Sequence, residues 1–224
     1  MSSCDSHLIT LPVRRFSHFY PQVRALLTEA FPSSELVPEW VLNTFALRRS
    51  IDFLAYFDPA QESSFCGITL TIHSEDLLFV IFLATDRSAR SKGYGSRILS
   101  QLKEHYPEHA IALEIEPMLR DAENFHQRER RLAFYQRNGF DETGLFTNYE
   151  DENYEILLYL PALLPDEGAT AQRYKDLGVL CGALEELLSS LTMPATGIER
   201  PSSSSITWRA ARTWTLPPSI KIRL

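Results

Sequence analysis

The stretch Arg90-Ser91-Lys92-Gly93-Tyr94-Gly95-Ser96 decides the fold, because it joins an apolar run to an amphipathic one. The run before it, 77–85, is typical of a buried strand, and Ile98, Leu102 and Tyr106 after it recur at helical spacing. Glycines let a backbone approach a ligand, and the N–H groups that begin a helix attract anions. Basic residues surround the turn, which therefore predicts a diphosphate site.

Two common phosphate motifs do not fit this turn. A dinucleotide-binding turn needs a third glycine three residues after Gly95, where the chain has Ile98. A Walker-type loop ends in Gly-Lys-Ser or Gly-Lys-Thr, and neither is present.

Strand-like and helix-like segments alternate on both sides of the turn, up to about residue 160. We expect strands at 7–13, 51–57, 65–73, 77–85, 110–115, 144–149 and 154–160, and helices at 20–31, after Pro38, at 96–106 and at 128–138. This pattern predicts an α/β fold: a mixed, mostly antiparallel central sheet of six to seven strands with helices on both faces.

The sequence divides into three expected parts. Residues 1–160 form the α/β domain, and 161–195 form a helical extension whose apolar helix at 174–191 could bury itself against a second copy, giving a homodimer. Residues 196–224 form a tail rich in serine and proline, with five basic residues against one acidic, and we expect disorder there.

Composition and charge limit the classes of partner and the location that we expect for this protein. The 224 residues carry 22 Lys and Arg against 29 Asp and Glu, a net charge of −7, which disfavours nucleic acid. No run approaches the roughly 18 apolar residues of a membrane span, and no signal peptide is recognisable. Three scattered cysteines fit the cytoplasm. The six histidines show no metal-ligand spacing, so we expect no metal site.

The motif Arg90-x-x-Gly93-x-Gly95 resembles the pyrophosphate loop of the GNAT superfamily of acyl-coenzyme A-dependent N-acyltransferases. A second element agrees with it: Tyr135, Gly139 and Phe140 match the superfamily's closing Tyr-x-x-x-Gly-Phe. The resemblance spans residues 8–160.

The resemblance implies acetyl-coenzyme A (acetyl-CoA) as cosubstrate. The backbone of the turn would hold the pyrophosphate, the end of the strand at 77–85 would pair with the pantetheine arm, and Tyr135 would protonate the departing thiolate. The residues expected to contact the coenzyme are Phe82, Leu83, Ala84, Arg90, Ser91, Lys92, Gly93, Tyr94, Gly95, Ser96, Asn124 and Arg128. Asn124 and Arg128 could instead cap and decorate a helix start, and Tyr135 could serve packing alone.

Acyl transfer to an amine also needs a proton acceptor. Glu114 and Glu116 are candidates, because residues i and i+2 share one face of a strand. The alternatives are a solvated sheet face or an ion pair with the arginine-rich helix. Glu35 is a candidate for the acceptor wall, or an exposed loop acid.

The sequence thus predicts an N-acetyltransferase that acts by direct transfer from acetyl-CoA to the primary amine of a small molecule or a protein. One alternative is a catalytically silent CoA-binding or regulatory protein on the same fold. A nucleotide-binding regulator is a third interpretation.

Overall fold

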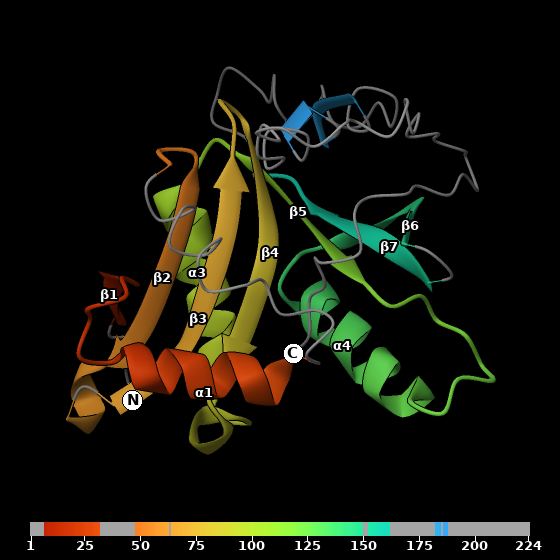
Figure 1. The fold of residues 1–224 in the computed structure, drawn as a ribbon. Coiled ribbons are helices and arrows are strands. Elements are labelled where there is room, and N and C mark those ends of the chain that lie inside the picture. The colour runs from red at the N-terminus through yellow and green to blue at the C-terminus, as the bar shows by residue number, and fades with distance from the viewer. Residues whose placement is uncertain are drawn as a thin grey trace, which may run out of the picture. The chain divides into compact units, whose positions relative to one another are not determined.

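The computed structural model describes residues 7–31, 48–62, 64–149, 152–161, 182–184 and 186–187 (Figure 1). The segment that contains Glu35 and the helix expected after Pro38 lies outside these residues, and so does the tail at 196–224. Of the helix expected at 174–191, the described residues 182–184 and 186–187 are helical.

A seven-stranded sheet forms the centre of the fold, in the order β1-β2-β3-β4-β5-β7-β6. The pairs β1–β2, β2–β3, β5–β7 and β6–β7 are antiparallel. The sheet is mixed and mostly antiparallel, as the sequence predicts. Its strands are β1 (Ile9–Pro12), β2 (Ile51–Asp58), β3 (Ser64–His73), β4 (Leu77–Thr85), β5 (Ala110–Ile115), β6 (Asp141–Tyr149) and β7 (Glu152–Tyr159).

The described helices are α1 (Tyr20–Ala30), α3 (Tyr94–His105) and α4 (Phe125–Arg137), and 3₁₀ turns lie at η1 (Pro59–Gln61) and η2 (Arg87–Ala89). In Figure 1, α1 lies in front of β2–β4 and α3 behind them, so helices cover both faces there. Phe31, after α1, packs on Phe82 of β4 with 4.7 Å between ring centroids.

A close approach on the α3 side depends on Gly67 of β3. A Cβ at this position would lie 2.4 Å from the carbonyl oxygen of Ala84 and 3.2 Å from Cδ1 of Ile98. The absence of a side chain therefore lets α3 and the end of β4 pack against β3.

The chain forms two compact units. The first contains the described parts of 1–72 together with 80–107, and the second contains 73–79 and the described residues from 108 onward. Pairing of β4 with β5 begins inside the second unit, where the N–H of Ala110 donates to the carbonyl of Asp76 at 2.9 Å.

Five expected element starts are wrong by two or three residues: β1 begins two residues later than expected, β7 begins two residues earlier, and α3, β6 and α4 also begin early. Helix α3 begins at Tyr94, because Gly93 takes the left-handed conformation (φ 80°) and serves as its N-cap. Strand β6 begins at Asp141, because a register shift around Gly144 (φ 69°) lets pairing continue upstream. Helix α4 begins at Phe125, one turn before the expected start.

Candidate active site

The first unit carries the turn that the sequence singles out. Strand β4 ends at Thr85, and the side chain of Asp86 then accepts the N–H of Ser88 and begins η2. Ser91 adopts a positive φ of 62° and Gly93 one of 80°, so the chain reverses twice before α3 starts. Buried β4 on one side and the buried face of α3 on the other fix both ends of the turn.

The backbone N–H groups at the start of α3 are open. No side chain caps this helix, and the first intrahelical bond runs from the N–H of Arg97 to the carbonyl of Gly93. In the part of the chain that the structure describes, the N–H groups of Tyr94, Gly95 and Ser96 donate to no protein atom. Open amides and a positive helix end are what an anionic phosphate requires.

Buried Tyr94 and Asp58, together with half-buried Arg97, anchor this helix start. The hydroxyl of Tyr94 donates to Asp58 at the end of β2, and Arg97 lies 3.5 Å from the same carboxylate and 5.0 Å from the centre of the Tyr94 ring. The hydrogen bond to Asp58, together with burial, raises the pKa of Tyr94 to about 12. The same hydrogen bond holds the pKa of Asp58 below its usual value.

The other expected coenzyme residues of the first unit differ in exposure. Phe82, Leu83 and Ala84 are buried within β4. Arg90 is exposed, and its guanidinium lies 2.9 Å from Glu29 of α1. Lys92 is exposed. The side chains of Arg90 and Lys92 are therefore accessible from solvent, and those of Phe82, Leu83 and Ala84 are not.

The second unit carries the two acidic candidates. Glu116, just after β5, pairs with the guanidinium of Arg131, lies 4.0 Å from that of Arg128 and accepts a hydrogen bond from Asn124. Burial opposes its ionisation, but Arg131, Asn124 and Arg128 outweigh burial and lower the pKa of Glu116. Of the alternatives weighed for Glu116, the structure therefore shows the ion pair with the arginine-rich helix.

Glu114 has different surroundings. It lies in β5, is buried, and accepts a hydrogen bond from the hydroxyl of Thr147 at 2.7 Å. Its paired residue on β7 is Ile156. Glu114 and Glu116 are thus only two residues apart in sequence but differ in their contacts. The neutral hydroxyl of Thr147 contacts Glu114, whereas two guanidinium groups contact Glu116.

Tyr135 lies on the buried side of α4. Its ring packs edge-on against those of Phe134 and Phe140, and burial raises the pKa of its hydroxyl well above the usual range. Within the described residues, this buried hydroxyl has no hydrogen-bond partner. A buried polar group without a partner is uncommon in a folded protein and fits a site that a ligand completes.

The same cluster shows where Asn124 and Arg128 lie. Asn124 precedes α4 but makes no side-chain cap; it instead accepts a hydrogen bond from Arg128 at 2.7 Å and donates to Glu116. Arg128 also donates to the carbonyl of Pro117 at 2.9 Å. Both residues therefore hold the segment between β5 and α4, and any contact with a coenzyme remains a prediction.

Sequence reasoning missed Asp58 and Arg131. The Tyr94–Asp58 bond joins residues 36 positions apart, and no motif marks an aspartate at a strand end. Arg131 is one of several arginines on a charged helix, and the sequence does not distinguish it from the others. Its burial, which the structure shows, sets it apart.

The described residues contain no group of three or more His, Cys, Asp or Glu side chains that could hold a metal ion. No helix in the described part of the chain is long and apolar enough to cross a membrane.

Comparison with known proteins identifies the family. The model of the acetyltransferase (GNAT) domain matches residues 50–142. A Bacillus subtilis protein named "Putative acetyltransferase YjbC" is 31% identical over 162 residues, which are 67% of this chain and 78% of that protein. The chain therefore belongs to the GNAT acetyltransferase family and is an acyltransferase.

Solved structures show the same fold. A GNAT-family protein from Bacteroides thetaiotaomicron superposes with a TM-score of 0.57 at 22% identity, over 78% of this chain and 98% of that one. The ribosomal-protein-S18-alanine N-acetyltransferase of Escherichia coli gives 0.54 at 14% identity, over 72% and 98%. An aminoglycoside 6'-N-acetyltransferase complexed with coenzyme A gives 0.54 at 15% identity, over 70% and 99%.

Proposed function

We propose that the protein transfers an acetyl group from acetyl-CoA to a primary amine by direct attack of the amine on the thioester. The observation that carries the proposal is the open helix start at Tyr94, Gly95 and Ser96, which follows a left-handed glycine and a buried strand. These N–H groups would hold the pyrophosphate of the cosubstrate. Membership of the GNAT family supports the reaction class.

Tyr135 is the proposed acid for the departing thiolate. A tyrosine hydroxyl is protonated at neutral pH, and burial raises the pKa of this one further, so a proton is present when the carbon–sulfur bond breaks. The lack of a protein partner leaves that proton uncommitted among the described residues. Transfer to the sulfur would leave a free thiol as the leaving group.

Glu114 is the proposed base. A primary amine is protonated at neutral pH, and it becomes a nucleophile only after it loses a proton. Glu116 is the poorer acceptor of that proton, because two guanidinium groups stabilise its charged form. We therefore assign proton removal to Glu114, directly or through a water, and give Glu116 a positioning role in the segment before α4.

The acceptor amine is either a small molecule or a protein group. Names of proteins with this fold include both kinds, an aminoglycoside and the alanine of a ribosomal protein, so the fold is compatible with either. Because the cosubstrate is a cytosolic metabolite, a cytoplasmic location belongs to the same proposal.

Release of free thiol tests the activity. The purified protein is incubated with acetyl-CoA and a panel of polyamines, aminoglycosides, amino acids and peptides with free amino termini, and thiol is measured with a chromogenic reagent. We expect thiol release above the amine-free rate with at least one class, and an acetylated product of the matching mass. Absence of both with every class would refute the catalytic proposal.

A catalytically silent CoA-binding protein is the second candidate. The edge-on packing of Tyr135 between Phe134 and Phe140 favours it, because a tyrosine held this way can serve the core alone. This candidate predicts coenzyme binding without thiol release. Amine-dependent thiol release by the wild-type chain excludes it, and a tenfold or greater loss of that release in Glu114→Gln would show that the release depends on the proposed base.

A further inference from the structure

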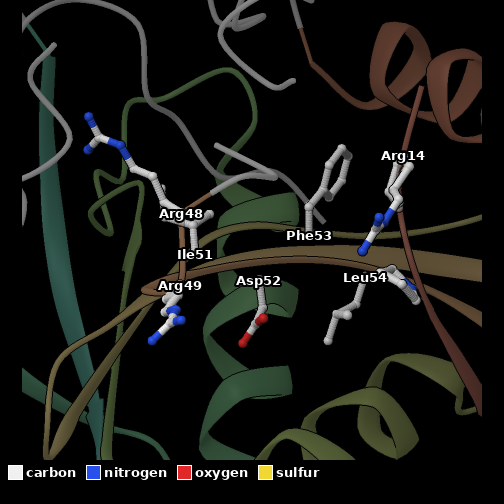
Figure 2. A pocket seen from close by; sticks show the side chains of 9 residues that line it. Arg14, Arg48, Arg49, Ile51, Asp52, Phe53 and Leu54 are labelled. Carbon is white, nitrogen blue, oxygen red and sulfur yellow. The ribbon is translucent and has the colours of Figure 1, made fainter. Parts of the chain in front are cut away.

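A hollow beside the start of β2 gathers positive charge. It has a volume of about 280 Å³ and lies wholly in the first unit (Figure 2). Arg14 reaches it from the segment after β1, and Arg48 and Arg49 reach it from the residues before β2. We call these three residues the arginine pocket. None of the residues that line it belongs to the turn at 90–96.

The guanidinium groups of Arg14 and Arg49 lack the carboxylate partners that other described arginines have. Arg90 pairs with Glu29, and Arg97 with Asp58. In the part of the chain that the structure describes, the side chains of Arg14 and Arg49 make no ion pair and no hydrogen bond. Unpaired like charges around one hollow repel one another, and this repulsion is relieved when an anion enters.

Among the described residues that line the hollow, the one acid is already engaged. Asp52 of β2 accepts a hydrogen bond from the hydroxyl of Tyr106, at the end of α3. The hollow is therefore lined by three arginines and one carboxylate, in a protein whose overall charge is −7. A local positive field within an acidic protein attracts small anions to this place rather than to the surface in general.

The residues that line the hollow come from two segments. Figure 2 shows Arg49, Asp52 and Leu54 extending to one side of β2, while Ile51 and Phe53 extend to the other. The guanidinium of Arg14 comes from a different part of the chain and lines the same hollow. A ligand held here would meet donors from two directions and would also contact apolar wall, which gives both affinity and orientation.

We propose that the arginine pocket binds a small organic anion through a carboxylate or phosphate group. Guanidinium groups donate paired hydrogen bonds whose geometry matches both oxyanions. The volume suits a ligand of few atoms rather than a nucleotide. The site is independent of the proposed acetyl transfer, so either proposal can fail without the other.

Calorimetric titration tests the pocket, with succinate as the carboxylate probe and inorganic phosphate as the other. The variants are Arg14→Ala, Arg49→Ala and their double, and the matched control is Arg15→Ala, which removes an adjacent exposed arginine that does not line the hollow. We expect each single variant to weaken binding at least tenfold and the control to change it less than twofold. Whichever probe binds identifies the preferred group.

Two results would overturn the proposal: neither probe binds the wild-type chain, or binding persists unchanged in the double variant. The second result would place the anion elsewhere, including at the turn at 90–96, which the double variant leaves intact. Arg14→Lys and Arg49→Lys keep the charge and lose the paired donors, so we expect a loss of about two- to fivefold. Circular dichroism melts establish that every variant is folded.

Discussion

The hydroxyl of Tyr94 lies 2.5 Å from Oδ2 of Asp58, and this bond joins the first residue of α3 to the last residue of β2. Asp58 also accepts the N–H of Ala60 and faces Arg97. One buried carboxylate therefore fixes the place where the open N–H groups of α3 begin. The turn before α3 owes its position to a strand outside the motif.

Tyr94→Phe tests this anchor. The variant keeps the ring but leaves the buried Asp58 with one donor fewer, so we expect the free energy of unfolding to fall by about 2 kcal/mol, as for a hydrogen bond to a charged group. We also expect weaker CoA binding, because the start of α3 is less fixed. Chemical denaturation and calorimetry measure the two effects. Unchanged CoA affinity would show that the anchor serves stability alone.

Gly93→Ala tests the turn itself, and Gly144→Ala is its matched control. Both glycines have a positive φ and open space where a Cβ would lie, so each substitution costs a similar backbone strain of about 1 kcal/mol. Of the two glycines, only Gly93 is the N-cap of α3. We expect both variants to melt earlier by a similar amount and only Gly93→Ala to lose CoA affinity. An equal loss of affinity in both would contradict the assignment.

Tyr135→Phe and Tyr56→Phe separate catalysis from packing. The hydroxyl of Tyr135 has no partner among the described residues, so we expect its removal to leave stability unchanged or raise it, while turnover falls tenfold or more. The hydroxyl of Tyr56 lies 3.0 Å from that of buried Thr69, so its removal should cost about 1 kcal/mol and spare turnover. Full turnover in Tyr135→Phe would leave this residue a packing role.

Glu116→Gln tests the charged cluster before α4. The folded chain lowers the pKa of Glu116, so its ionised form contributes stability at neutral pH, and that contribution disappears as the pH falls through the lowered pKa. We expect the free energy of unfolding of the variant to be about 2 kcal/mol below that of the wild type at pH 7. This difference between variant and wild type should narrow below about pH 4. Turnover should survive, in contrast to Glu114→Gln. A gap that is constant with pH would show that charge is not the cause.

Gly67→Ala tests the close approach of α3 to the sheet. The new Cβ would meet backbone at 2.4 Å, which cannot move aside cheaply, so we expect a loss of about 1–3 kcal/mol and a lower melting temperature. Gly182→Ala is the control, since nothing lies within 4 Å of its Cβ position and the residue is helical. If the two variants melt alike, the close approach is not tight in solution.

Two central strands were the most predictable part of the fold. Strands β4 and β5 coincide with the expected ranges to the residue, because both are continuous apolar runs between polar residues. Element starts were less predictable. They depend on single backbone conformations, such as the left-handed Gly93 before α3 and the bulge around Gly144 in β6, which hydrophobic periodicity does not encode.

The turn at 90–96 was predictable because its signal is local. The side-chain partners were not, because pairs such as Tyr94 with Asp58 or Arg131 with Glu116 join segments far apart in the chain. The sequence could list an ion pair among the alternatives for Glu116, but only the fold identifies Arg131 as its partner. The three residues of the arginine pocket carry no periodic pattern, and only the placement of β1 beside β2 brings them together.

Calorimetric titration of the wild-type protein with coenzyme A and, in parallel, with pantetheine tests most directly whether the turn holds a pyrophosphate. The two ligands share the thiol-bearing arm, and pantetheine lacks the pyrophosphate together with the phosphorylated adenosine beyond it. We predict one coenzyme A bound per chain, at least tenfold more tightly than pantetheine. Equal affinity for the two ligands, or no detectable binding of coenzyme A, would contradict the assignment of the open N–H groups at Tyr94, Gly95 and Ser96.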